Sequence, residues 1–212
     1  MKTNTIITIG RECGSGGREI GMKLSKKLGI PYYDKQLLKE AAKQSGLCEE
    51  IFESFDEKPT SSFLYSLAMD PYSFGYSNGT INMPLNHKVF LAALDTIKNI
   101  AEKGPCIFIG RCADYVLSDF HNCVNLFINA PLDFRVDRIC KEHNMTKEQA
   151  INFIHKKDKQ RSSYYNYYAS NKWGDMSTYD LCINSSVLGI DGTVNLIEQY
   201  VNLFENKNKT SL

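Results

Sequence analysis

The sequence TIITIGRECGSGGREI, residues 5–20, decides the fold. It begins with an apolar run at 5–9, typical of a buried strand, continues with a glycine-rich turn at 10–17, and opens a helical pattern with an apolar stripe at 18–28. A strand, a glycine turn and a helix in this order bring consecutive backbone N–H groups and the positive end of the helix dipole to one point. The sequence therefore predicts an anion-binding loop, and the expected ligand is a phosphate.

The composition is that of one domain of ordinary charge. The chain has 212 residues, of which 42% are hydrophobic and 23% charged, so we expect one core and one domain over 1–212. The formal net charge of +1 gives no reason to expect a nucleic-acid partner, and no apolar segment is long enough to predict a membrane partner. The seven cysteines include no CxxC pair, which favours a reducing, cytoplasmic compartment and no metal site.

Strand and helix patterns alternate along the rest of the chain. Four further apolar runs predict strands at 30–34, 105–109, 123–128 and 179–184, and helical patterns occupy 35–44, 87–102, 132–143 and 192–204. Another helix is predicted to start at Thr146, with Gln149 completing a capping box, and to end near Arg161, before a tyrosine-rich stretch. Strands this continuously apolar predict an α/β fold, a five-stranded parallel sheet with helices on both faces.

One segment interrupts the alternation. Residues 54–86 are rich in Ser, Pro, Gly and Tyr and show only short helical periodicity. We expect an inserted element that covers a substrate.

Four blocks of the sequence resemble a known family. ITIGRECGSGGREIG, KKLGIPYYD, DEKPTSSFLYSL and GPCIFIGRCADYVL are similar to the cytidylate-kinase-like branch of the P-loop nucleoside monophosphate kinases. The resemblance implies a phosphate loop after the first strand, an acceptor-binding insert at about 54–86 and a mobile basic lid at about 146–175. It also implies ATP with Mg²⁺ as the donor and a small nucleotide as the acceptor.

The chain departs from that family's pattern at three positions. Gly17 stands where cytidylate kinases carry the loop lysine, Glu19 stands near the position of their threonine, and Ile109 replaces the aspartate of their Asp-Gly-Arg motif. We therefore expect Mg²⁺ to be held mainly by the nucleotide and by water. Phosphoryl transfer depends on charge stabilisation, so these losses bear directly on the rate of any reaction.

The loop and its neighbours supply the phosphate-binding candidates. Arg18 lies one residue beyond the vacant lysine position, and we expect its planar guanidinium to reach the same cavity. The alternative is a side chain that faces solvent on the first helical turn. The full predicted set for phosphate and nucleotide binding is Gly10, Arg11, Gly14, Ser15, Gly16, Gly17, Arg18 and Glu19.

Other candidates lie farther along the chain. Arg111 follows a strand at the carboxyl edge of the sheet, where parallel sheets bind ligands, and it matches the acceptor-phosphate arginine that the resemblance implies; a surface ion pair is the alternative. Asp34 and Asp114 are the predicted acceptor-side acids, although Asp34 also suits a helix cap. The basic cluster predicted for the lid is Lys157, Lys159 and Arg161, which would equally complement a helix dipole. Arg18, Arg111 and Arg161 form the predicted catalytic set.

Three further features have plainer interpretations. Arg135 and Arg138, with Asp133 and Asp137, are expected to form surface ion pairs. The tyrosines at 164, 165, 167 and 168 suit stacking on a base, packing of the lid on the body, or a subunit contact in a homodimer. Cys13 lies near a helix N-terminus, which is expected to lower its pKa.

Three functions remain open at this point. The first is ATP-dependent phosphoryl transfer to a small acceptor, a nucleoside monophosphate such as CMP or dCMP. The second is a protein that keeps the anion-binding loop and binds a nucleotide or phosphometabolite without turning it over. The third is a kinase whose acceptor is not a nucleotide.

Overall fold

The computed structural model describes residues 3–45 and 85–210. The predicted insert lies outside these residues, apart from its last two positions. The elements in chain order are β1 (Ile6–Arg11), α1 (Gly17–Leu28), β2 (Tyr32–Tyr33), α2 (Lys35–Ser45), α5 (Leu85–Ala101), β3 (Ile107–Ile109), α6 (Ala113–Val116), β4 (Cys123–Asn129), α7 (Leu132–His143), α8 (Lys147–Tyr168), a 3₁₀ turn (Met176–Thr178), β5 (Leu181–Asn184) and α9 (Ser185–Thr210).

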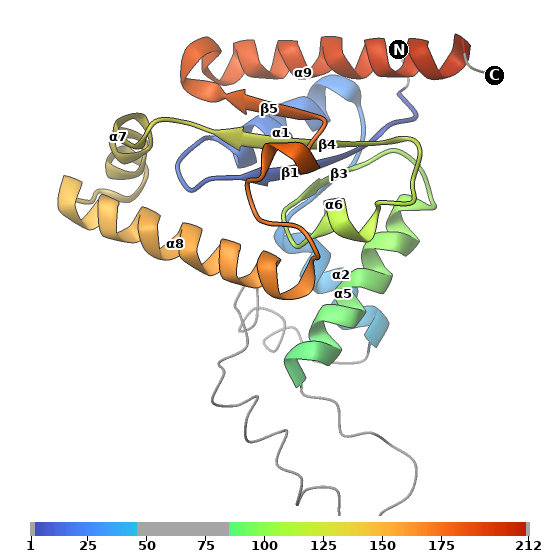
Figure 1. The fold of residues 1–212 in the computed structure, drawn as a ribbon, viewed down its shortest axis with the longest axis horizontal. Coiled ribbons are helices and arrows are strands. Elements are labelled where there is room, and N and C mark those ends of the chain that lie inside the picture. Colours follow the sequence, from blue (N-terminus) through green and yellow to red (C-terminus); the bar gives the residue numbers. More distant parts are fainter. Residues whose placement is uncertain (1–2, 46–84, 211–212) are drawn as a thin grey trace, which may run out of the picture.

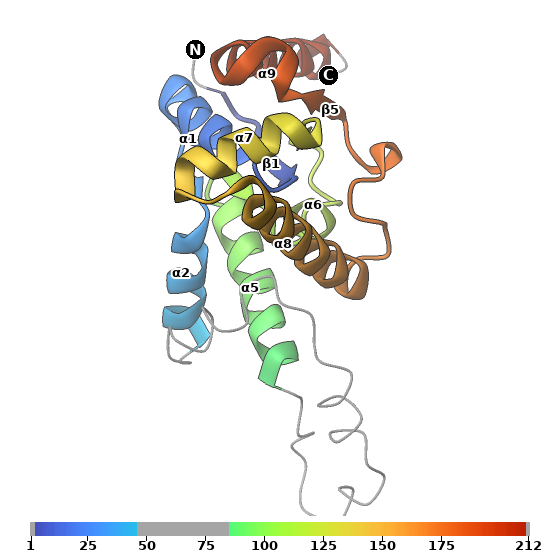
Figure 2. The ribbon, with the colours of Figure 1, turned by 90° about the vertical axis from the view of Figure 1, so that its left-hand side faces the viewer.

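The five strands form one parallel sheet in the order β2-β3-β1-β4-β5. Helices α1 and α9 cover one face, and α2, α5 and α6 cover the other (Figures 1 and 2). The strands point toward α7 and α8, which lie at the carboxyl edge of the sheet (Figure 1). The predicted fold is confirmed. Within the described ranges, no helix is both long and apolar enough to cross a bilayer.

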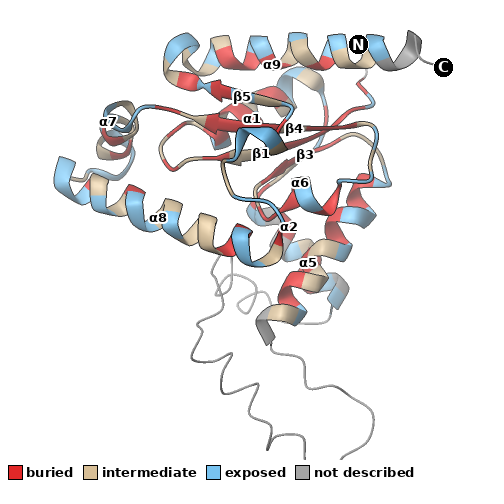
Figure 3. Cartoon of the chain, in the orientation of Figure 1, coloured by how far each residue is buried: buried red, intermediate tan, exposed pale blue. Residues whose placement is uncertain are grey.

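Alternating side chains of β1 divide the core in two. Ile7 and Ile9 pack with α1 and α9, whereas Ile6 packs on the opposite side with α5 and α6. All three are fully buried, and the buried strands lie between the helical layers in Figure 3. Because β1 lies between β3 and β4, the loops that follow β1 and β3 are neighbours at the carboxyl edge.

Helix α8 is longer than the sequence predicts. Its capping box at Thr146 and Gln149 is confirmed, but the helix continues through the tyrosine-rich stretch to Tyr168. The Tyr168 ring stacks on Phe90 of α5 with centroids 3.9 Å apart, and Tyr164 and Tyr165 are buried. This packing explains the extension, because it depends on a distant helix that local patterns do not reveal.

Helix α9 also extends beyond the predicted 192–204. Its first turn is separated from the long segment by Gly189, whose backbone is non-helical with φ of 65°. Glycine adopts this conformation, with positive φ and an extended ψ of −177°, without a Cβ penalty.

Candidate phosphate-binding site

The loop between β1 and α1 turns sharply at two glycines. Gly14 and Gly16 have φ of 79° and 81°, a region that other residues rarely adopt. A Cβ on Gly14 would lie 2.9 Å from the carbonyl oxygen of Arg135, so α7 also restricts this position. Ser15 is fully buried; its Oγ donates to the Glu12 carbonyl oxygen at 2.9 Å, and its own carbonyl accepts from Ser185 Oγ at 2.6 Å. The buried hydrogen bonds of Ser15 therefore stabilise the turn.

Helix α1 begins directly at this turn. The first N–H groups of a helix have no partner within the helix, and its dipole places positive charge at that end. Gly16 and Gly17, at the start of α1, line a cavity of about 620 Å³. The loop therefore has the geometry of an anion-binding turn that opens into a cavity.

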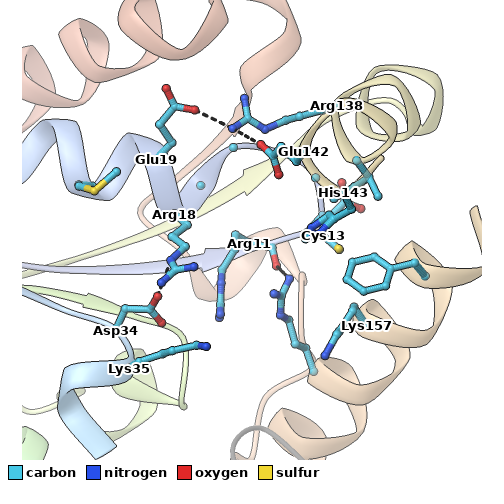
Figure 4. A pocket seen from close by; sticks show the side chains of 18 of the residues that line it. Arg11, Cys13, Arg18, Glu19, Asp34, Lys35, Arg138, Glu142, His143 and Lys157 are labelled. Carbon is cyan, nitrogen blue, oxygen red and sulfur yellow. Dashed lines mark hydrogen bonds and ion pairs between the residues drawn. The ribbon is translucent and has the colours of Figure 1, made fainter. Parts of the chain in front are cut away.

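The cavity is rich in cations (Figure 4). Four of the acidic residues of the chain also line it, namely Glu12, Glu19, Asp34 and Glu142. Its arginine and lysine residues come from the end of β1, from α1 and α2, from the turn after β3, and from α7 and α8: Arg11, Arg18, Lys35, Arg111, Arg138, Lys157 and Arg161. This excess of positive charge suits a ligand that carries several negative charges.

Asp34 connects two of the predicted arginines. Its Oδ2 lies 2.6 Å from Arg18 Nε, and its Oδ1 lies 3.3 Å from Arg111 Nη1. The two arginines differ in burial, since the Arg18 side chain is 64% exposed and that of Arg111 only 3%. Arg111 also has a left-handed backbone, φ 56°, and its Nη1 donates to the Ile109 carbonyl at 3.2 Å. The structure thus brings Arg18, Asp34 and Arg111 together on one side of the cavity.

Helix α8 brings two of its three predicted basic residues to the cavity. Lys157 and Arg161 are four residues apart and share one helical face, and both line the cavity. Arg161 Nη1 donates to the Arg11 carbonyl at 3.4 Å. Lys159 lies between them in sequence but on another face, where it is exposed.

Asp114 lies beside a second, smaller cavity of about 20 Å³, which Gly10 and Arg111 also line. Tyr165 Oη donates to Asp114 Oδ2 at 2.6 Å. Burial raises the pKa of Asp114, although the tyrosine hydrogen bond opposes this. Asp114 lies outside the set of residues that line the larger cavity.

Two sequence interpretations need correction. Arg135 does not form a surface pair with Asp133, because its side chain is 11% exposed and its Nη1 lies 2.6 Å from Asp158 on α8. Arg138 lines the cavity, and its Nη2 lies 2.6 Å from both Glu19 and Glu142. Both arginines were expected to pair with acids of their own helix, Asp133 and Asp137. This expectation was wrong because α7 faces the phosphate loop and α1.

The hydrogen bond from Arg138 has an electrostatic consequence. It lowers the pKa of Glu19.

The expectation for Cys13 is also wrong. Burial raises the pKa of the Cys13 thiol, and this effect outweighs the nearby positive charge of Arg161, which lowers the pKa. The side chain is 6% exposed and packs against apolar residues of α7 and α8, among them Val136 and Ile154. Burial outweighs the helix dipole here.

Some cavity residues were missed by the sequence analysis. His143 of α7 and Phe153 of α8 line the cavity beside Arg138 and Glu142. The i,i+4 spacing of Arg138 and Glu142 suits the ion pair that they form, but the expected pairing was with Asp133 and Asp137, and no spacing shows which side of the helix faces the loop.

Comparison with known proteins agrees with this architecture. The chain is 26% identical over 204 residues to a cytidylate kinase of Sulfurisphaera tokodaii, covering 96% of this chain and 98% of the relative. It is 22% identical over 199 residues to a cytidylate kinase of Pyrococcus horikoshii, covering 93% and 88%.

Solved structures show the same fold. An uncharacterized protein from Eubacterium ventriosum superposes with a TM-score of 0.69 at 28% identity, covering 93% of this chain and 98% of that one. A shikimate kinase from Bacteroides thetaiotaomicron reaches a TM-score of 0.50 at 14% identity, with the same coverages, and shares the fold alone. The model of the Cytidylate kinase-like family matches residues 6–187. The chain belongs to the Cytidylate kinase-like family.

Proposed function

We propose that this protein transfers a phosphoryl group from ATP to a small acceptor, a nucleoside monophosphate such as CMP or dCMP. The observation that carries the proposal is the cavity in which the glycine loop, Arg111 and the basic face of α8 meet at the carboxyl edge of a parallel sheet. Membership of the Cytidylate kinase-like family supports phosphoryl transfer of this type.

Each group has a distinct task in this proposal. The amides of residues 14–18 hold the donor phosphates at the start of α1. Arg111 and Arg18 hold the phosphate of the acceptor, which competes with the Asp34 carboxylate for their N–H groups. Lys157 and Arg161 of α8 neutralise charge on the transferring group. Positioning and charge stabilisation supply most of the catalysis in such reactions.

Magnesium enters this scheme with the nucleotide. Among the described residues, no group of three or more His, Cys, Asp or Glu side chains is placed to hold a metal. The cavity acids already have partners: Asp34 pairs with Arg18, Glu19 with Arg138, and Glu12 accepts from the Ala130 N–H at 3.0 Å. These residues fit Mg²⁺ that is bound mainly by ATP oxygens and water.

The test combines binding and turnover. Thermal shift would be measured with ATP, CMP, dCMP, UMP and sulfate, followed by an assay of ADP release with Mg²⁺ and each acceptor. We expect acceptor-dependent ADP release that Arg111→Ala reduces by at least 100-fold, about 3 kcal/mol in transition-state stabilisation. Lys159→Ala, which removes an exposed positive charge of α8 that does not line the cavity, is the control and should retain activity.

A second function is favoured by one observation. Gly17 and the buried Ile109 replace the loop lysine and the acidic residue that the resemblance implies, and this favours a protein that binds phosphates without catalysing their transfer. In that case ATP and CMP would raise the melting temperature, but no acceptor would release ADP.

A further inference from the structure

Positions 11 and 17 are in contact, and only one of them has room for a side chain. A Cβ on Gly17 would lie 2.7 Å from the Cβ of Arg11 and 3.3 Å from its Cγ. The first distance is too short for two carbon atoms that are not bonded. Ile128 of β4 closes the space from another side, with its Cβ 3.3 Å from the same point. A side chain at 17 therefore clashes with the side chain at 11 in its present position, and losing the side chain at 11 is the direct way to relieve the clash.

The sequence shows a matching exchange. The general phosphate-loop motif is G-x-x-x-x-G-K, with glycine at its first position and lysine at its seventh. This chain reads R-E-C-G-S-G-G over 11–17, so a cation stands at the first position and glycine at the seventh. The glycine and the cation have exchanged places across one contact.

We infer that Arg11 supplies, from the end of β1, the cation that lysine at the seventh position supplies in other phosphate loops. The inference rests on the proposed function, because it assigns Arg11 to the donor phosphates. It differs from the expectation for Arg18, which lies next to the vacant position in sequence but pairs with Asp34 in the structure.

The surroundings of Arg11 suit this task. It is the last residue of β1, it is 9% exposed, and it lines the cavity together with Gly16 and Gly17. Figure 4 shows its side chain extending between Arg18 and Lys157. β1 is paired on both sides, Arg11 itself being in register with Ile128, so the sheet fixes the base of the side chain. A planar guanidinium in this position can contact two phosphate oxygens at once.

The contact between the two positions makes the inference testable by exchange. The variants are Arg11→Ala, Arg11→Gly and Gly17→Lys, and Gly17→Lys combined with each change at 11. Arg11→Ala removes the guanidinium but keeps the Cβ that blocks position 17, whereas Arg11→Gly removes both. Melting temperature without ligand and the Kd for ATP with Mg²⁺, from titration calorimetry, would be measured for each.

We expect both single changes at Arg11 to weaken ATP binding by about tenfold or more, the usual effect of losing a hydrogen bond to a charged group. Gly17→Lys alone should lower the melting temperature, because it overpacks the contact. Arg11→Gly with Gly17→Lys should regain both melting temperature and ATP affinity, and Arg11→Ala with Gly17→Lys should regain neither. Lys103→Ala, an exposed charge beyond α5, controls for net charge.

The outcomes separate this inference from the proposed function. If the wild-type protein binds ATP and the Arg11 variants bind it within twofold as well, the inference is overturned and the proposed function stands. It is likewise overturned if the two double variants behave alike. If the wild-type protein does not bind ATP at all, the proposed function and the role of Arg11 are both rejected.

Discussion

At the scale of single residues, Asp34 pairs with the buried Arg111 and the exposed Arg18. We expect these two arginines to contribute differently to stability. Arg111→Ala should lower the free energy of unfolding by about 2–4 kcal/mol, because it leaves a buried carboxylate with half of its partners. Arg18→Ala should cost no more than about 1 kcal/mol, since that side chain is 64% exposed. Urea denaturation of both variants tests this, and equal losses would contradict the assigned difference in burial.

Asp114 should give the stability a pH dependence of its own. Burial raises its pKa in the folded protein above the ordinary value of 3.8, so the folded state binds the proton more tightly than the unfolded state. The stability that this group contributes is present below pH 3.8 and is lost as the pH rises through the folded pKa. In Asp114→Asn, the free energy of unfolding should therefore fall less with increasing pH above about pH 4. Denaturation at several pH values measures this, with the exposed Asp119→Asn as control; parallel curves for wild type and Asp114→Asn would refute it.

At the scale of elements, Asp158 ties helix α8 to the phosphate loop. Its Oδ1 accepts the Cys13 N–H at 2.7 Å, and its Oδ2 lies 2.6 Å from Arg135 Nη1 of α7. Asp158→Asn can keep the first bond but loses the charge, whereas Asp158→Ala loses both. We expect a loss of about 1–3 kcal/mol in Asp158→Ala and a smaller one in Asp158→Asn.

Amide hydrogen exchange measures the hydrogen bond between Asp158 and the Cys13 N–H directly. The Cys13 amide should exchange faster in Asp158→Ala, because its acceptor is gone, and less so in Asp158→Asn. The amide of Ile7, in the middle of β1, is an internal reference. Unchanged exchange at Cys13 would mean that the loop does not depend on α8.

Elements were predictable where the local pattern decides them, and misjudged where distant contacts do. The strands β1 and β4 are buried on both faces, so their continuous apolar runs identified them. The end of α8 was misplaced because Tyr168 is fixed by Phe90 of α5. In the site, Arg111 was found from its place after a strand, but Arg138 was misjudged because its partner Glu19 belongs to α1. Sequence spacing shows which residues share a helical face, but it does not show which other element packs against that face.

At the scale of the whole molecule, the order of the strands is a product of pairing between distant segments. β1 lies between β3 and β4, and each pair joins residues about 100 positions apart, as Ile7 with Ile107 and Ile6 with Cys123 show. The apolar residue pattern predicts that these strands are buried, but it does not predict which strands pair with each other. The same pairing sets the loop after β1 beside Arg111, which makes the candidate site a long-range feature.

Residues 3–5, which precede β1, contact the last part of α9 at the opposite edge of the sheet. Glu205 Oε1, near the end of α9, accepts hydrogen bonds from Thr3 Oγ1 at 2.5 Å, the Asn4 N–H at 2.8 Å and Thr5 Oγ1 at 2.8 Å. Glu205→Ala should lower the free energy of unfolding by about 1–3 kcal/mol, because three donors lose a charged acceptor. Glu205→Gln should lose less, since an amide oxygen still accepts.

The Glu205 contact and the cavity lie at opposite edges of the sheet, so we expect the loss of this contact to leave ATP binding unchanged. Thr5 precedes β1, whereas the cavity lies beyond its other end, so Glu205→Ala should lower the melting temperature without changing the Kd for ATP. Asp158→Ala, at the loop, should alter both. Titration calorimetry below the melting temperature distinguishes the two cases, with the exposed Glu102→Ala as a control for lost charge. A weaker ATP affinity in Glu205→Ala would mean that the strand transmits strain from its amino end to the loop, and that the two edges of the sheet are energetically coupled.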